Sequence, residues 1–115
     1  MLREKNTADS FDVARLRRPT AIFAANDVMA TAVIDTARNL AGLCLPRDLS
    51  VIGFDNTPLG ATLGYALTSV DQNIEMMAAQ AIDILRARVE NPAMATVKRL
   101  LPARLEMRAS VGPPA

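Results

Sequence analysis

The chain has 115 residues, is 50% hydrophobic and 3% aromatic, and carries a formal net charge of +1. That length predicts one globular domain, and the nearly balanced charge provides no electrostatic footprint for nucleic acid. No apolar run approaches the roughly 20 residues that cross a membrane, and the N-terminus lacks the apolar core of an export signal. We therefore expect a soluble cytoplasmic protein with no membrane partner.

Histidine is absent from the chain, and cysteine occurs once, as Cys44. Without histidine, Ser-His and Cys-His nucleophiles and the histidine-containing zinc sites are excluded. Cys44 lies between apolar neighbours in GLCLP, which predicts a small buried hydrophobic residue. We expect no enzyme activity, no bound metal and no cofactor.

The first half of the chain predicts a strand, a helix and a second strand. Residues 20–25 form a short apolar run, which we expect to be a strand buried on both faces inside a sheet. Apolar residues recur at helical spacing over residues 29–40, and Gly42 and Pro46 then prevent the helix from continuing. Residues 49–54 are again apolar and include β-branched side chains. This order predicts a right-handed βαβ unit, and hence an α/β fold with a Rossmann-like parallel sheet and flanking helices.

The second half predicts shorter elements around one long helix. A turn-rich segment contains a short helix over residues 58–63, and a short strand follows over residues 67–70. Helical spacing over residues 73–89 predicts the longest helix of the chain. Charged and apolar residues then alternate over residues 104–109, which predicts a strand with one solvated face. We expect residues 111–115 to be disordered.

Polar residues follow each of the first three predicted strands. In open parallel sheets, ligands bind beyond the carboxyl ends of the strands. Neighbouring strands lie about 4.8 Å apart, so side chains from adjacent strand ends can converge on one small ligand. Carboxylates and amides supply acceptors and paired donors together, which suits a hydroxylated ligand such as a sugar or a nucleoside. The residues concerned are Asn26, Asp27, Asp55, Asn56, Asp71 and Gln72.

Four of these side chains also have a purely structural interpretation. Asp27 precedes a helix, and we expect it to be the N-cap rather than a ligand contact. Asn26 could complete the same turn. Asp55 opens a Thr-Pro turn and could bond its local backbone, and Gln72 stands equally close to a helix start. The chemistry predicts a polar pocket and leaves its ligand open.

Three motifs carry a family resemblance. The stretches PTAIFAAND, LPRDLSVIGFDN and LTSVDQ occur in that order, and LLPARLEMRAS follows them. From Arg18 to Ser110 the chain resembles the C-terminal part of the ligand-sensing core of LacI/GalR-family transcriptional regulators. The resemblance implies a periplasmic-binding-protein-like type I fold, in which two α/β subdomains close over an effector, commonly a sugar or a purine. This chain would supply one of those subdomains.

The resemblance also implies functional residues. The effector contacts would include Asn26, Asp55 and Gln72, with Phe54 lining the cleft, while Asp27 would begin the helix. The helix over residues 29–40 and the turn over residues 59–64 would form a homodimer surface; ordinary packing on the sheet is the alternative. The dimer residues implied are Met29, Val33, Leu59 and Leu63.

The resemblance divides the chain into three parts. Residues 1–17 are a lead-in, helical or partly disordered, in which Arg15 and Arg17, together with Arg18, are interpreted as a solvated helix end rather than a phosphate contact. Residues 18–110 are the effector subdomain, and 111–115 the tail. The helix-turn-helix, the hinge helix and the first sensing subdomain of the family have no counterpart here, so DNA would be bound only through the missing N-terminal part. The helix over residues 73–89 would belong with the missing subdomain, and its free apolar stripe favours a dimer, swapped or not.

Two other functions share parts of this pattern. A periplasmic sugar receptor of a transporter has the same fold and a similar GFD turn. The sequences of the motifs LPRDLSVIGFDN and LLPARLEMRAS favour the regulator. A phosphoacceptor receiver domain would use Asp55, but it needs an acidic pair and a nearby lysine. Lys5 and Lys98 are the only lysines, and both lie outside the strand and helix core. We therefore expect the effector-sensing and dimerising portion of a regulator.

Overall fold

The computed structural model describes residues 19–115, and the lead-in with its arginine cluster lies outside this range. Among the described residues, no helix is both long and apolar enough to cross a bilayer. The elements are β1 (Ala21–Phe23), α2 (Asp27–Asn39), β2 (Ser50–Phe54), β3 (Thr68–Asp71), α3 (Ile74–Glu90) and β4 (Arg104–Glu106).

The four strands form one sheet in the order β1-β2-β3-β4. β1 pairs with β2 and β2 with β3 in parallel, so that Phe23 lies opposite Ile52 and Phe54 opposite Val70. β4 is antiparallel to β3. The predicted α/β class with parallel strands and a helical crossover is therefore confirmed.

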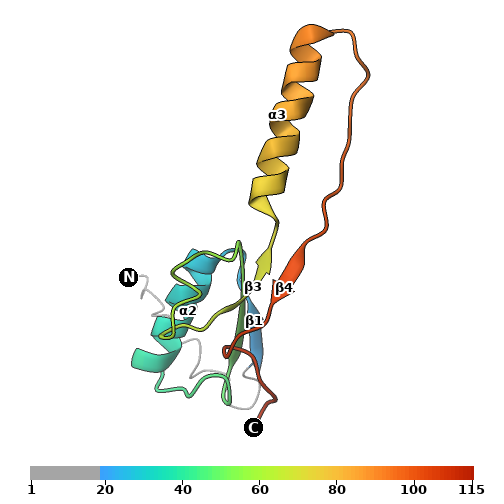
Figure 1. Cartoon of the computed structure of the whole chain (residues 1–115). Helices are drawn as coiled ribbons and strands as arrows, with labels where there is room; N and C mark the ends of the chain where they lie inside the picture. Colours follow the sequence, from blue (N-terminus) through green and yellow to red (C-terminus); the bar gives the residue numbers. More distant parts are fainter. Residues whose placement is uncertain (1–18) are drawn as a thin grey trace, which may run out of the picture.

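One face of the sheet is covered by α2 (Figure 1). Ala30, Ile34 and Ala37 are fully buried and lie on one side of that helix, since they are four and three residues apart. They pack with Leu49 and Val51 in the core, which Leu67 also joins. The helical periodicity read from the sequence thus identifies the core face of α2.

β1 differs from its prediction. It has three residues, lies at the edge of the described sheet, and leaves Phe23 62% exposed. The expectation of a strand buried on both faces was wrong, because Ile22 packs against the core while Ala21 and Phe23, on the opposite face, are exposed.

α3 projects away from the sheet, and the segment that returns to β4 runs beside it (Figure 1). The helix has 17 residues close to the predicted bounds, and none of them is buried. Ile74 is 56% exposed and Leu85 57% exposed, as expected for an apolar stripe without a covering layer. Arg88 ties the end of the helix to the return segment by donating hydrogen bonds to the carbonyls of Met94 and Ala95.

Two local predictions were wrong. Residues 58–63 form successive turns rather than a helix, with isolated bonds such as Thr62 N to Leu59 O at 3.2 Å. Cys44 is exposed instead of buried. Its neighbours Leu43 and Leu45 pack against the core, which leaves the side chain between them facing outward.

The chain beyond β4 is fastened to β2. The buried Ser110 hydroxyl donates to the carbonyl of Val51 at 2.6 Å and accepts from the Thr68 backbone N at 2.8 Å. Gly112, in the tail for which the sequence predicts disorder, exchanges two 3.0 Å hydrogen bonds with the Ser50 hydroxyl. The strand predicted over residues 104–109 is accordingly limited to β4, and the last part of that range follows Thr68 as irregular chain. The domain boundaries at residues 18 and 110 stay predictions.

Candidate ligand-binding site

The carboxyl ends of β2 and β3 bring Asp55 and Gln72 together. Gln72 Nε2 donates a 2.6 Å hydrogen bond to Asp55 Oδ1, and both residues are half-buried. The Asp55 backbone N continues the strand ladder by donating to the Val70 carbonyl at 2.9 Å. Within residues 19–115, no group bonds the second oxygen of the Asp55 carboxylate. Asp55 and Gln72 thus lie together, as expected for residues that follow the carboxyl ends of neighbouring parallel strands.

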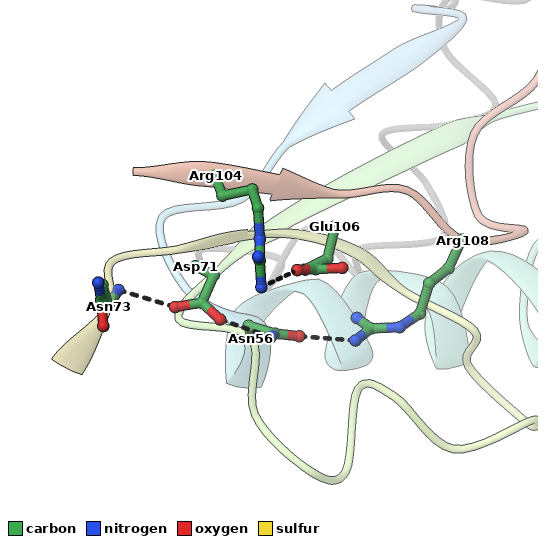
Figure 2. Close-up of polar contacts among 6 residues, drawn as sticks. All are labelled: Asn56, Asp71, Asn73, Arg104, Glu106 and Arg108. Atoms are coloured by element: carbon green, nitrogen blue, oxygen red, sulfur yellow. Dashed lines mark hydrogen bonds and ion pairs between the residues drawn. The ribbon is translucent and has the colours of Figure 1, made fainter. Parts of the chain in front are cut away.

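A second link, between Asn56 and Asp71, joins the same two strand ends (Figure 2). Asn56 Nδ2 donates to Asp71 Oδ2 at 3.0 Å, and Asp71 Oδ1 accepts from the Asn73 backbone N at 2.7 Å. The Asn73 N–H, and next the Asn56 amide, hold the pKa of Asp71 below its ordinary value, and the nearby charge of Arg104 acts in the same direction. Asp71 is therefore a charged acceptor that holds the backbone N–H of Asn73, the residue after Gln72.

The backbone at these strand ends is unusual. Asp55 has φ +112°, Asn56 +52° and Asn73 +56°, all in the region that side chains with a Cβ rarely adopt. Asn and Asp tolerate the left-handed region better than other non-glycine residues. Strained conformations persist only where surrounding bonds hold them, and they are concentrated at binding sites. Here the holding bonds are those of Asp55 to Gln72 and of Asn56 to Asp71.

The cap role predicted for Asp27 requires a correction. Asn26 is the N-cap of α2, because its Oδ1 accepts from the Met29 backbone N at 2.8 Å. Asp27 is the first helical residue and was wrongly predicted to be the cap. No bond of the Asn26 Nδ2 group occurs among the described residues, and Asn26 is half-buried. Its amide nitrogen therefore has donors available to a ligand.

Asp27 instead connects the start of α2 to the loop after β2 and to β3. Its Oδ1 accepts from the Ser69 hydroxyl at 2.6 Å, and its Oδ2 accepts from the Thr57 backbone N at 2.6 Å and hydroxyl at 2.9 Å. The residue is 1% exposed. A buried carboxylate is tolerated when such charge-assisted bonds replace its hydration. Asp27 thus fixes the loop after β2 and the middle of β3 to the start of α2.

Two glycines make room for the Asp27 carboxylate. A Cβ at Gly53 would lie 2.3 Å from Asp27 Oδ1 and 2.9 Å from Leu67 Cδ2. A Cβ at Gly60 would lie 3.0 Å from Asp27 Oδ2. These glycines in VIGFDNTPLG are the sequence signal for a close approach, although the pattern alone does not reveal which group approaches.

The residues predicted for the dimer surface lie on α2 and in the turn over residues 59–64, which follows β2. Tyr65 OH donates to Asp35 Oδ2 at 2.9 Å, and Arg38 Nη1 donates to the Gly64 carbonyl, so turn and helix are fastened together. Val33 is half-buried against the core, and Phe54, at the end of β2, is also half-buried. The exposed residues are Met29 (55%), Leu59 (56%) and Leu63 (97%), which together we call the α2–turn surface.

The polar strand ends are suited to hydrogen bonding rather than to a metal. Residues 19–115 contain no group of three or more acidic, cysteine or histidine side chains that could hold an ion. Lys98 lines a cavity of about 490 Å³ beside α3 together with Met77 and Ala81, not the end of β2 that carries Asp55. The available groups are an oxygen of Asp55, the amide oxygen of Gln72 and the amide nitrogen of Asn26, a mixture of acceptors and donors.

Comparisons with known proteins identify the family and agree with the α/β fold. Residues 2–111 match the model of the periplasmic binding protein-like domain. The HTH-type transcriptional regulator DegA of Bacillus subtilis is 43% identical over 95 residues, which cover 83% of this chain and 28% of that protein. A solved regulatory protein of the LacI family from Chloroflexus aggregans is 39% identical, with a TM-score of 0.78 over 92% of this chain and 37% of that one.

A second solved structure contains a ligand. The LacI-family transcriptional regulator from Enterococcus faecium with bound ribose is 27% identical, with a TM-score of 0.78 over 92% of this chain and 39% of that one. The chain therefore spans between 28% and 39% of the length of these relatives. The relatives are transcriptional regulators and not enzymes. Because the family model covers nearly the whole sequence, the chain belongs to the periplasmic binding protein-like family, as a part of the effector-binding core of the LacI type.

Proposed function

We propose that this chain contributes one wall of an effector site for a small hydroxylated molecule, a sugar or a nucleoside-like compound, in a cytoplasmic transcriptional regulator. The observation that supports it best is the Asp55 and Gln72 pair, which joins the carboxyl ends of adjacent parallel strands and keeps acceptor capacity unused. Asn26, which follows β1, would add donors beyond the carboxyl end of the neighbouring parallel strand.

The chemistry of these groups suits a hydroxyl-bearing ligand. A hydroxyl group can donate to the second Asp55 oxygen and accept from the Asn26 amide at the same time. Phe54, half-buried next to Asp55, offers an apolar surface for the ring of a sugar or a base. The ribose bound by the relative from Enterococcus faecium supports a ligand of this class.

The other wall of the site would come from the rest of a longer protein. α3 and its return segment carry apolar residues with no covering layer, and the relatives are more than twice as long as this chain. We propose that a second subdomain packs there, that two copies pair through the α2–turn surface, and that DNA is bound by a separate part of such a protein. Effector binding would then favour one arrangement of the subdomains over another.

The experiment is ligand-detected NMR on the 115-residue chain, with D-ribose and adenosine as probes. One wall of a site binds weakly, so saturation-transfer signals and titration to high ligand concentration are the suitable readouts. We expect binding of at least one probe. Gln72→Ala should weaken that binding by about fivefold or more, as the loss of one hydrogen bond of about 1 kcal/mol implies.

Gln80→Ala is the matched control, because Gln80 lies on α3 beside the return segment and not at the strand ends. It should bind the probes as the unmodified chain does. Equal losses in the two variants, or no binding of either probe to the unmodified chain, would count against the proposed site.

A further inference from the structure

Arg108 reaches from the chain after β4 to the end of β2. Its backbone is locked to Thr68, whose Oγ1 accepts from Arg108 N at 2.9 Å and donates to Arg108 O at 3.1 Å. The guanidinium then divides its donors: Nη1 donates to the Leu67 carbonyl and Nη2 to Asn56 Oδ1, each at 2.7 Å. This planar fork is thus fixed at its base and at both of its ends.

The bond from Arg108 also decides which way the Asn56 amide points. A guanidinium can only donate, so the side of the amide that faces it must be the oxygen. The Nδ2 group is then directed to the opposite side, where it donates to Asp71 Oδ2 at 3.0 Å (Figure 2). The reversed amide would place a donor against Arg108 and an oxygen against a carboxylate.

Asp71 passes this constraint to the backbone on both sides of Gln72. Its second oxygen accepts from the Asn73 backbone N at 2.7 Å, and Asn73 takes the left-handed conformation that precedes α3. Gln72 lies between Asp71 and Asn73, and its side chain donates to Asp55 at 2.6 Å. Asp71 and Asn73, which flank Gln72, are therefore held by bonds other than the one between Gln72 and Asp55.

We propose that Arg108 is a positioning residue for the effector site. It sets Asn56, Asn56 sets Asp71, and the turn around Asp71 places the Gln72 amide against Asp55 with the geometry that a ligand meets. The role as an effector-site residue rests on the proposed function; the dependence of Gln72 on Arg108 does not.

The test replaces Arg108 by lysine in the 115-residue chain. Arg108→Lys keeps the positive charge, but a single ammonium group cannot span the Leu67 carbonyl and Asn56 as the fork does. Two-dimensional NMR would follow the side-chain amide signals of Asn56 and Gln72 and the backbone amide of Asn73. We expect all three to shift. Arg86→Lys on the exposed face of α3 is the matched control and should leave them in place.

A carboxyl titration of Asp71 separates positioning from mere structural support. The pKa of Asp71 is lowered by the Asn73 N–H and then by the Asn56 amide, so Arg108→Lys should raise it toward the ordinary value once Asn56 can reorient. Arg104 and Glu106 form an ion pair of 2.7 Å beside this network. The substitution of Arg108 changes neither of these two residues. A loosening of β4 would also raise this pKa by moving the charge of Arg104 away, so the shift supports positioning only where the backbone amide signals of Arg104 to Glu106 stay in place.

Asn56→Asp tests the same series of hydrogen bonds at Asn56, which lies between Arg108 and Asp71. This variant keeps the proposal testable if Arg108→Lys does not fold. The carboxylate still accepts from Arg108 but has no donor for Asp71 and repels it, so the pKa of Asp71 should rise and the Gln72 amide signal should shift. Unchanged Gln72 and Asp71 signals in a folded variant of either kind would overturn the proposal. None of these readouts needs a sugar or nucleoside, so a failure of probe binding would count against the proposed function alone.

Discussion

Asp27 and Thr57 are 30 residues apart in the chain, and one carboxylate oxygen of Asp27 accepts both the backbone N–H and the hydroxyl of Thr57. The other oxygen accepts from the Ser69 hydroxyl, which itself accepts from the Asn56 backbone N at 2.9 Å. The conformation of residues 55–57, which carry Asp55 into the candidate site, is thereby tied to a residue adjacent to Asn26. A defect at Asp27 should therefore reach the site as well as the stability of the fold.

Replacing Thr57 by valine should lower the free energy of unfolding by about 1.5–3 kcal/mol, the range for a hydrogen bond to a charged group. The shape of the side chain is nearly kept, but the hydroxyl bond to Asp27 Oδ2 is lost. Urea unfolding would measure the change. Thr57→Ser retains the hydroxyl and should recover most of the loss. If serine were as destabilising as valine, the methyl group rather than the bond to Asp27 would be the cause.

Replacing Gly53 by alanine should lower the free energy of unfolding, although it adds only one methyl group. The new methyl group would meet Asp27 Oδ1 at 2.3 Å and Leu67 Cδ2 at 2.9 Å, and both of these residues are buried. We expect a loss of roughly 1–3 kcal/mol or more in the free energy of unfolding, as for an overpacked core. Gly64→Ala is the matched control, since a Cβ there meets nothing within 4 Å. A thermal scan showing equal midpoints for the two variants would contradict the close approach.

The elements and the central pair could be predicted because they follow from local patterns and one topological rule. Helical periodicity identified α2 and α3 to within two residues at each end. The rule that parallel strands end at one edge of the sheet was enough to predict that Asp55 and Gln72 converge, which they do. Neither inference required knowledge of any other contact.

The role of Asp27 could not be predicted in the same way. A carboxylate just before an apolar helix suits a cap, and the sequence gives no reason to prefer partners that lie 30 and 42 residues further on. The prediction that Cys44 is buried failed for a related reason. Its apolar neighbours suggested burial, but Leu43 and Leu45 are the residues that pack against the core, and Cys44 between them is exposed. Both errors concern the direction of one side chain, which depends on packing rather than on composition.

The α2–turn surface makes a prediction about oligomeric state. Leu63 is 97% exposed in the single chain, so Leu63→Asp should hardly affect the stability of the monomer. If two copies pair through this surface, the unmodified chain should sediment as a dimer and Leu63→Asp as a monomer, because a charge would be buried at the interface. Leu100→Asp, at a site 85% exposed in the return segment, is the control and should remain dimeric. Dissociation by Leu100→Asp alone would instead assign the interface to the arm formed by α3 and its return segment.

The link between Tyr65 and Asp35 can be tested by its pH dependence. The phenol donates a hydrogen bond to the carboxylate, which raises the pKa of Tyr65, and burial and the negative charge of Asp35 act in the same direction against the opposing charge of Arg38. The stability from this bond is complete below the ordinary pKa of tyrosine and is lost as the pH rises through the higher pKa of the folded chain. Tyr65 is the only tyrosine, so the absorbance of tyrosinate reports its ionisation directly. We expect a midpoint above the ordinary value, and Asp35→Ala should lower it, whereas Asp83→Ala on α3 should not; a midpoint insensitive to Asp35 would show that the bond fastening the turn to α2 does not form in solution.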